Sequence, residues 1–131
     1  MEDKTKLFGK MGEDSAAAFL CGKGFRIIER NARAGHLEID IVAEKDGTVA
    51  FTEVKTRSEY PGSDSRFSRP CFAVTRSKQE KLIAAAREYM RRDTSLSGHP
   101  FRIDIVEVYI QPKCDKYKVL KIYHMPNSVH P

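Results

Sequence analysis

Residues 37–55 read LEIDIVAEKDGTVAFTEVK, and this stretch decides the fold. Residues 37–43 alternate apolar and acidic side chains with a period of two, which is the pattern of a half-buried β-strand. Residues 49–55 are a second strand candidate, and the Asp-Gly pair between the two segments is a strong signal for a tight type I′ turn. The stretch therefore predicts a β-hairpin.

The predicted hairpin brings acidic side chains together. With the Asp-Gly pair at the centre of the turn, Asp40 lies opposite Glu53, and Glu38 lies opposite Lys55. Residues two apart share a face of a sheet, so all four side chains are expected on one side. Two directly opposed carboxylates destabilise a hairpin, so something must compensate for them. A shared proton or a bound divalent cation would do so.

Two carboxylates beside an ammonium group suit metal-assisted hydrolysis of a phosphodiester. Mg²⁺ prefers one or two protein carboxylates together with water and phosphate oxygens, so Asp40 and Glu53 are candidate metal ligands. Lys55 would orient the attacking water or neutralise charge that builds on the phosphate. The alternative is a solvated hairpin face, on which Glu38 and Lys55 form a surface ion pair worth at most ~1 kcal/mol.

The rest of the chain predicts two helices and three more strands. The helices are expected at residues 12–24 and 77–92, and the strands at residues 25–31, 101–110 and 117–123. Ser77, with Glu80 three residues later, forms a capping box for the second helix. The order α-β-β-β-α-β-β predicts an α/β fold, a mixed sheet flanked by helices. We expect a single domain over residues 1–125 and a flexible tail over residues 126–131.

Charge is unevenly distributed along the chain. The 131 residues include 23 Lys and Arg and 18 Asp and Glu, for a net charge of +5. Residues 1–65 hold 10 basic and 12 acidic side chains and residues 66–131 hold 13 and 6, so the halves carry −2 and +7. Nucleic-acid-binding proteins show such asymmetry, although a basic surface without a partner would look the same. The candidate phosphate contacts are Arg57, Arg66, Arg69, Arg76, Lys78 and Lys81.

The cysteines and the hydropathy pattern point to the cytoplasm. Cys21, Cys71 and Cys114 are odd in number and far apart, so we expect buried, reduced thiols rather than disulfides. No apolar run approaches the ~18 residues that span a bilayer, and the first residues lack the apolar core of a signal peptide. A membrane protein and a secreted protein are therefore not expected.

The wider sequence resembles a known family. Asp40 followed by Glu53-Val54-Lys55 is similar to the D…ExK signature of the PD-(D/E)xK nucleases. Around it stand GEDSAAAFL, GFRIIERNAR, LEIDIVA, FTEVKTR, AVTRSKQEKL and FRIDIV, and together they resemble the YraN-type family of bacterial proteins over residues 8–125. That family is similar to archaeal Holliday-junction resolvases. The resemblance implies a restriction-endonuclease-like αβββαβ core.

The resemblance also implies roles for individual residues. Asp40 and Glu53 match the metal-binding carboxylates of such nucleases, and Lys55 matches their catalytic lysine. In resolvase-like enzymes a glutamate on the first helix completes the site, and Glu13 holds that position here, where the helix dipole also favours an acidic residue. The implied activity is a Mg²⁺- or Mn²⁺-dependent endonuclease that cuts branched or otherwise structured DNA. The implied assembly is a homodimer, since one domain carries one site.

Two other classes of function remain open. One is a non-catalytic nucleic-acid-binding module, or a partner in a DNA repair or processing complex. The other is a metal-free structural protein, which would need a separate reason for two opposed carboxylates. Metal titration followed by cleavage assays separates these classes from a nuclease.

Overall fold

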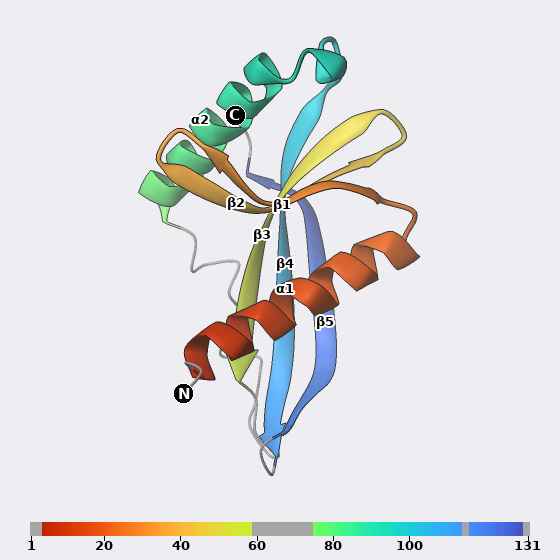
Figure 1. The fold of residues 1–131 in the computed structure, drawn as a ribbon, viewed down its shortest axis with the longest axis vertical. Coiled ribbons are helices and arrows are strands. Elements are labelled where there is room, and N and C mark those ends of the chain that lie inside the picture. Colours follow the sequence, from red (N-terminus) through yellow and green to blue (C-terminus); the bar gives the residue numbers. More distant parts are fainter. Residues whose placement is uncertain (1–3, 59–74, 114–115, 130–131) are drawn as a thin grey trace.

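The computed structural model describes residues 4–58, 75–113 and 116–129, which form a five-stranded sheet with a long helix on each face (Figure 1). A short 3₁₀-helix precedes the fourth strand. In chain order the elements are α1 (Lys4–Gly22), β1 (Arg26–Ala34), β2 (Leu37–Lys45), β3 (Thr48–Ser58), α2 (Arg76–Arg92), η3 (Thr94–Leu96), β4 (Phe101–Lys113) and β5 (Lys116–Val129).

The sheet is mixed, as the sequence predicts. Its strand order is β1-β2-β3-β4-β5, and neighbouring strands run antiparallel except for the central pair, β3 and β4, which run parallel. A parallel pair needs a crossover connection, and α2 lies within that crossover. The predicted α/β fold with an αβββαβ core is therefore confirmed, and β5 adds a further strand at the sheet edge.

The predicted hairpin between β2 and β3 is present with its predicted turn. Asp46 and Gly47 have φ angles of 52° and 80°, as a type I′ turn requires at both central positions. The paired register runs from Lys45 opposite Thr48, beside the turn, to Ile41 opposite Thr52. Asp40 and Glu53, the candidate metal ligands, come directly after this last pair.

Each face of the sheet buries its own apolar cluster. On one face, Ala16 and Leu20 of α1 pack with Ile41 of β2 and with Val106 and Val108 of β4. The other face packs α2 against the sheet through the buried side chains of Leu82, Ala85, Ala86, Tyr89, Val42, Phe51 and Ile103. The two helices thus cover opposite faces, and α1 crosses the middle strands in Figure 1.

Several predicted boundaries were wrong, and packing explains one of them. Helix α1 begins at Lys4 rather than near Gly12, because Phe8 and Met11 pack against the apolar cluster under α1 and extend the helix. The N-cap of α2 is Thr75 and not Ser77, and its hydroxyl accepts the backbone N–H of Lys78 at 3.1 Å.

The end of the chain and the cysteines also differ from expectation. Strand β5 continues through Pro126 as far as Val129, so residues 126–129 of the expected tail belong to the strand, and Val129 pairs with Ile103 of β4. Cys21 is exposed rather than buried, while Cys71 and Cys114 lie outside the described residues. Within the described ranges, no helix is both long enough and apolar enough to cross a lipid bilayer.

Gly12 lies where α1 approaches β3 closely. A Cβ atom there would overlap the Thr56 hydroxyl group of β3 and would lie 2.9 Å from Thr56 Cβ. We therefore expect Gly12→Ala to destabilise the protein by about 1–3 kcal/mol, because overpacking shifts the backbone or the side chain. Gly9→Ala is the matched control, since nothing lies within 4 Å of its added Cβ atom, and it should stabilise α1 by up to ~1 kcal/mol. Urea denaturation measures both, and a gain in stability for both variants would contradict this packing.

Candidate active site

Asp40 lies where β2 and β3 stop pairing. The last paired residues are Ile41 and Thr52, and beyond them Asp40 Oδ2 accepts the backbone N–H of Val54 at 2.8 Å. A side-chain carboxylate thus takes the place of a ladder hydrogen bond at this fork between the strands. Val54 directly follows Glu53, so the hydrogen bond also fixes Asp40 beside the second candidate carboxylate.

Strand β2 changes face at Asp40. Ile39 packs in the cluster under α2 and Ile41 in the cluster under α1, although residues two apart in a regular strand share a face. Asn31, level with Asp40 in the β1–β2 ladder, has a left-handed φ of 52°. Asp40 therefore meets Glu13 of α1. The prediction that all four polar side chains share one face of a regular hairpin was wrong.

Burial and neighbouring negative charge raise the pKa of Asp40. Burial is the largest cause that raises the pKa of Asp40 to about 7, and the negative charge of Glu53 adds to it, while the Val54 N–H opposes the rise. Burial also raises the pKa of Glu13, which hydrogen-bonds to Asp40. The hydrogen bond thus joins two carboxyl groups whose pKa values are both raised.

Glu53 is the buried acidic residue of β3, and two ammonium groups face it. Glu53 is 7% exposed. Glu53 Oε1 lies 3.5 Å from Lys55 Nζ and 3.8 Å from Lys78 Nζ, so cations from β3 and from the first turn of α2 converge on one carboxylate. Lys78 was predicted as a phosphate contact, and the structure places it at the carboxylates.

Glu38 lies beside Glu13 rather than beside Lys55. With its amide nitrogen turned toward them, Asn31 donates to Glu13 Oε2 and to Glu38 Oε1, each at 3.2 Å. Glu38 therefore lies on the α1 side with Glu13, and the predicted pairing of Glu38 with Lys55 was wrong. The face change of β2 at Asp40 is the physical reason.

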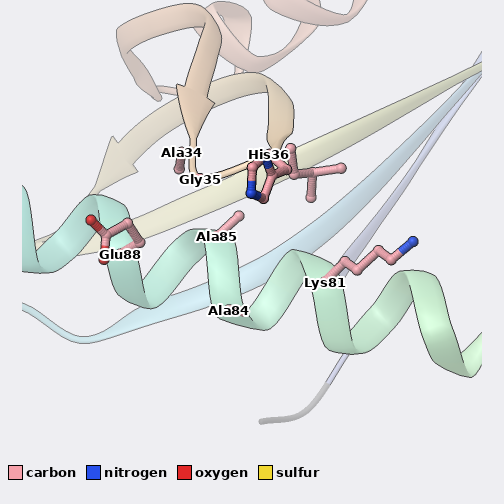
Figure 2. A pocket seen from close by; sticks show the side chains of 8 residues that line it. Ala34, Gly35, His36, Lys81, Ala84, Ala85 and Glu88 are labelled. Carbon is pink, nitrogen blue, oxygen red and sulfur yellow. The ribbon is translucent and has the colours of Figure 1, made fainter.

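The other predicted phosphate contacts lie in different places. Arg57 follows Lys55 on the same face of β3, whereas Arg76 is exposed and pairs with Glu80 at 3.6 Å. Lys81 lines a groove of about 510 Å³ between α2 and the β1–β2 turn, opposite His36 (Figure 2). Arg66 and Arg69 lie outside the described residues.

Glu107 of β4 is a further acidic residue that sequence reasoning missed. It lies level with Lys55 in the parallel β3–β4 register and is 3% exposed, and Tyr109 donates its hydroxyl proton to Glu107 Oε2 at 2.9 Å. The signal was present in FRIDIVEVYI, residues 101–110, where an acidic residue interrupts a strand that is otherwise apolar over its second half.

The carboxylate oxygens fit a hard divalent cation. In the part of the chain that the structure describes, no three His, Cys, Asp or Glu side chains form a ready metal-ligand group. Mg²⁺ needs only one or two protein carboxylates, because water and phosphate oxygens complete its shell. Asp40 and Glu53 provide two, and a bound cation would favour the ionised form of Asp40, whose pKa burial raises to about 7.

Comparison with known proteins links the chain to a family without an assigned activity. The model of the uncharacterised protein family UPF0102 matches residues 12–108. A UPF0102 protein of Chloroherpeton thalassium is 44% identical over 103 residues, which cover 79% of this chain and 75% of that relative. A UPF0102 protein of Clostridioides difficile is 37% identical over 128 residues, which cover 98% of this chain and 99% of that relative.

Several solved structures are also similar to this chain, and one of them comes from Pyrococcus furiosus. It is titled as the structure of Pyrococcus furiosus SfsA in complex with Ca²⁺, and it matches with a TM-score of 0.39 and 16% identity. The match covers 97% of this chain and 65% of that chain.

Proposed function

The chain belongs to the uncharacterised protein family UPF0102, and from its site we propose a Mg²⁺-dependent endonuclease that hydrolyses phosphodiester bonds in structured or branched DNA. The observation that carries this proposal is the fork between β2 and β3. There a half-buried Asp40 with a raised pKa, a buried Glu53 and the ammonium group of Lys55 meet.

Asp40 and Glu53 would hold the Mg²⁺ or Mn²⁺ ion. When bound, such an ion polarises the phosphate and lowers the pKa of a coordinated water. Lys55, 3.5 Å from Glu53, would neutralise charge that builds on the phosphate oxygens or orient the attacking water. Glu13 acts as a positioning residue, because its hydrogen bond with Asp40 holds that carboxyl group at the fork.

The choice of DNA rests on charge and on the resemblance. Arg57 continues the face that carries Lys55, and Lys78 of α2 faces the same carboxylates, so cations surround the site where a phosphate would bind. The order Asp40, Glu53, Lys55 matches the PD-(D/E)xK signature. A branched DNA substrate has two strands to cut, so we propose a homodimer that acts in the cytoplasm.

A cleavage assay tests the proposed function. Linear, flapped and four-way DNA substrates are incubated with the protein and Mg²⁺ or Mn²⁺, and rates are compared for wild type, Lys55→Met and Lys45→Met. Lys55→Met should lower the rate by about 10²–10³-fold, because it removes the cation that stabilises the transition state. Lys45→Met is the charge-matched control, since Lys45 lies beside the turn at the other end of the hairpin, and its rate should be unchanged.

Two results would contradict the proposal. Wild-type protein that cuts none of these substrates with either metal, while wild type and Asp40→Ala bind DNA equally well, would identify a non-catalytic binding module. Absence of any DNA binding at low salt would exclude both functions.

A further inference from the structure

The register of β3, β4 and β5 places an aromatic and basic surface next to the candidate active site. Residues paired across strands share a face of the sheet, so rows of three side chains cross these strands. The rows are Glu53–Ile105–Met125, Lys55–Glu107–Tyr123 and Arg57–Tyr109–Lys121. Tyr123 therefore lies two strands from Lys55, roughly 10 Å away at the usual strand spacing.

Tyr123 is the most exposed large aromatic side chain among the described residues, at 48%. The ring of Tyr109 meets it edge-to-face, with centroids 5.8 Å apart and planes at 85°. Lys121 Nζ lies 5.7 Å from the centroid of Tyr123 and 4.9 Å from that of Tyr109. A buried tyrosine ring and a lysine ammonium group thus lie against a ring that still presents about half of its surface to solvent.

The charges around Tyr123 complement a phosphate backbone. Lys55 and Arg57 of β3 and Lys121 of β5 lie on its face of the sheet, and Lys118 follows on β5, opposite Gln111. Glu53 and Glu107 are the acidic side chains of the same rows, and both are buried. The solvent-facing charge beside the ring is therefore positive, and it is continuous with Lys55 at the site.

We propose that Tyr123 stacks on an unpaired base of a single-stranded nucleic acid segment whose backbone follows Arg57, Lys121 and Lys55. This inference rests on the proposed function and names the substrate class: nucleic acid that is single-stranded beside the scissile phosphate. Both faces of a base in a duplex are covered by its neighbours, so an exposed ring can stack only on a base that has left the stack. The spacing of roughly 10 Å puts that base about one to three nucleotides from Lys55.

A fluorescent base tests the stacking directly. A single-stranded oligothymidine with one 2-aminopurine is titrated with protein in EDTA at low salt, where binding is seen without cleavage. Wild-type protein should quench the fluorophore, because stacking on an aromatic ring quenches it. Tyr123→Phe should retain the quenching, and Tyr123→Ala should lose it and weaken binding by about 5- to 150-fold, the range that one stacked base gives.

Leu120→Ala is the matched control. Leu120 is another exposed apolar side chain of β5, at 39%, so its removal should leave both quenching and affinity unchanged. Circular dichroism confirms that each variant is folded. A blunt duplex of the same length should bind Tyr123→Ala and wild type equally well, because it offers no unpaired base.

The outcomes separate this inference from the proposed function. Cleavage without quenching would overturn the stacking role and leave the proposed nuclease activity in place. Quenching without cleavage would support the stacking role and contradict the nuclease activity. Equal affinity of wild type and Tyr123→Ala for single strands would also overturn the inference. If sedimentation showed that Tyr123→Ala turns a dimer into a monomer with quenching unchanged, the exposed ring would instead contact a second copy of the chain.

Discussion

Asp40→Asn is expected to abolish metal-dependent cleavage, with a loss of about 10³-fold or more, because the variant removes one of the two carboxylates that would hold the ion. Asparagine keeps an oxygen that can accept the Val54 N–H, so the fork between β2 and β3 should persist. Calorimetric titration with Mn²⁺ should show heat of binding for wild type and none for the variant. Equal Mn²⁺ affinity of the two proteins would remove Asp40 from the metal centre.

The same variant should change how stability depends on pH without metal. The pKa of Asp40 is about 7 in the folded protein and near 3.8 when the chain unfolds. The folded state therefore binds the proton more tightly, and stability falls as pH rises from about 4 to 7, by at most about 4 kcal/mol. Asp40→Asn, which cannot ionise, should show a flatter profile between pH 5 and 7.5 in urea denaturation with EDTA.

Asp46→Asn is the control for the pH experiment. It also replaces one aspartate by asparagine, but at the exposed turn, where asparagine tolerates the left-handed φ of 52° equally well. Its pH profile should follow that of wild type. If stability depended on pH as steeply in Asp40→Asn as in wild type, the raised pKa of Asp40 could not be the cause of that dependence.

The second large effect is expected at Asp104 of β4, which lies level with Thr52 in the parallel register of β3 and β4. Asp104 is fully buried and accepts hydrogen bonds from His124 Nε2 at 2.8 Å, from the Asn127 N–H at 2.9 Å and from Arg102 Nε at 3.0 Å. Asp104→Ala should cost about 3–5 kcal/mol, because it leaves the buried imidazole of His124 without its acceptor and the half-buried Arg102 without its counter-charge. Urea denaturation at neutral pH measures this loss.

Lowering the pH should reproduce part of the loss of stability that is expected for Asp104→Ala. Burial alone would raise the pKa of Asp104, but the hydrogen bonds from His124, the Asn127 N–H and Arg102 outweigh burial and hold the pKa below its usual value. The stability from this carboxylate is therefore present above pH 4 and lost as pH falls further. Glu80→Ala, which breaks the exposed ion pair with Arg76, is the control and should change stability by no more than ~0.5 kcal/mol. Similar losses for Asp104→Ala and Glu80→Ala would contradict the assigned role.

The sequence predicted the elements because each is encoded locally. Alternation in residues 37–43 and the Asp46-Gly47 turn specify the hairpin without reference to the rest of the chain. The start of α1 could not be predicted in the same way. Gly9 and Gly12 lower helix propensity there, and contacts of Phe8 and Met11 with the sheet override that local preference.

The sequence predicted which side chains meet at the candidate site better than it predicted how they are arranged. Counting residues outward from the turn placed Asp40 near Glu53, as the structure does, but it assumed that β2 is a regular strand. The face change at Asp40 accompanies a left-handed Asn31 on the neighbouring strand, and a single asparagine is too weak a signal to predict such a kink. Lys78 and Glu107 reach the site from α2 and β4, so only the tertiary fold could place them.

The parallel pairing of β3 with β4 has a consequence for folding kinetics. β1, β2 and β3 form a meander with short connections, and β4 with β5 forms a second local hairpin, whereas β3 and β4 meet only after the chain has closed the long crossover through α2. Joining the two halves is the strand pairing with the greatest sequence separation in the sheet, so we expect it to limit the folding rate. The lysine of β3 and the stacking tyrosine of β5 belong to different halves, so the surface they share is completed only at that late step.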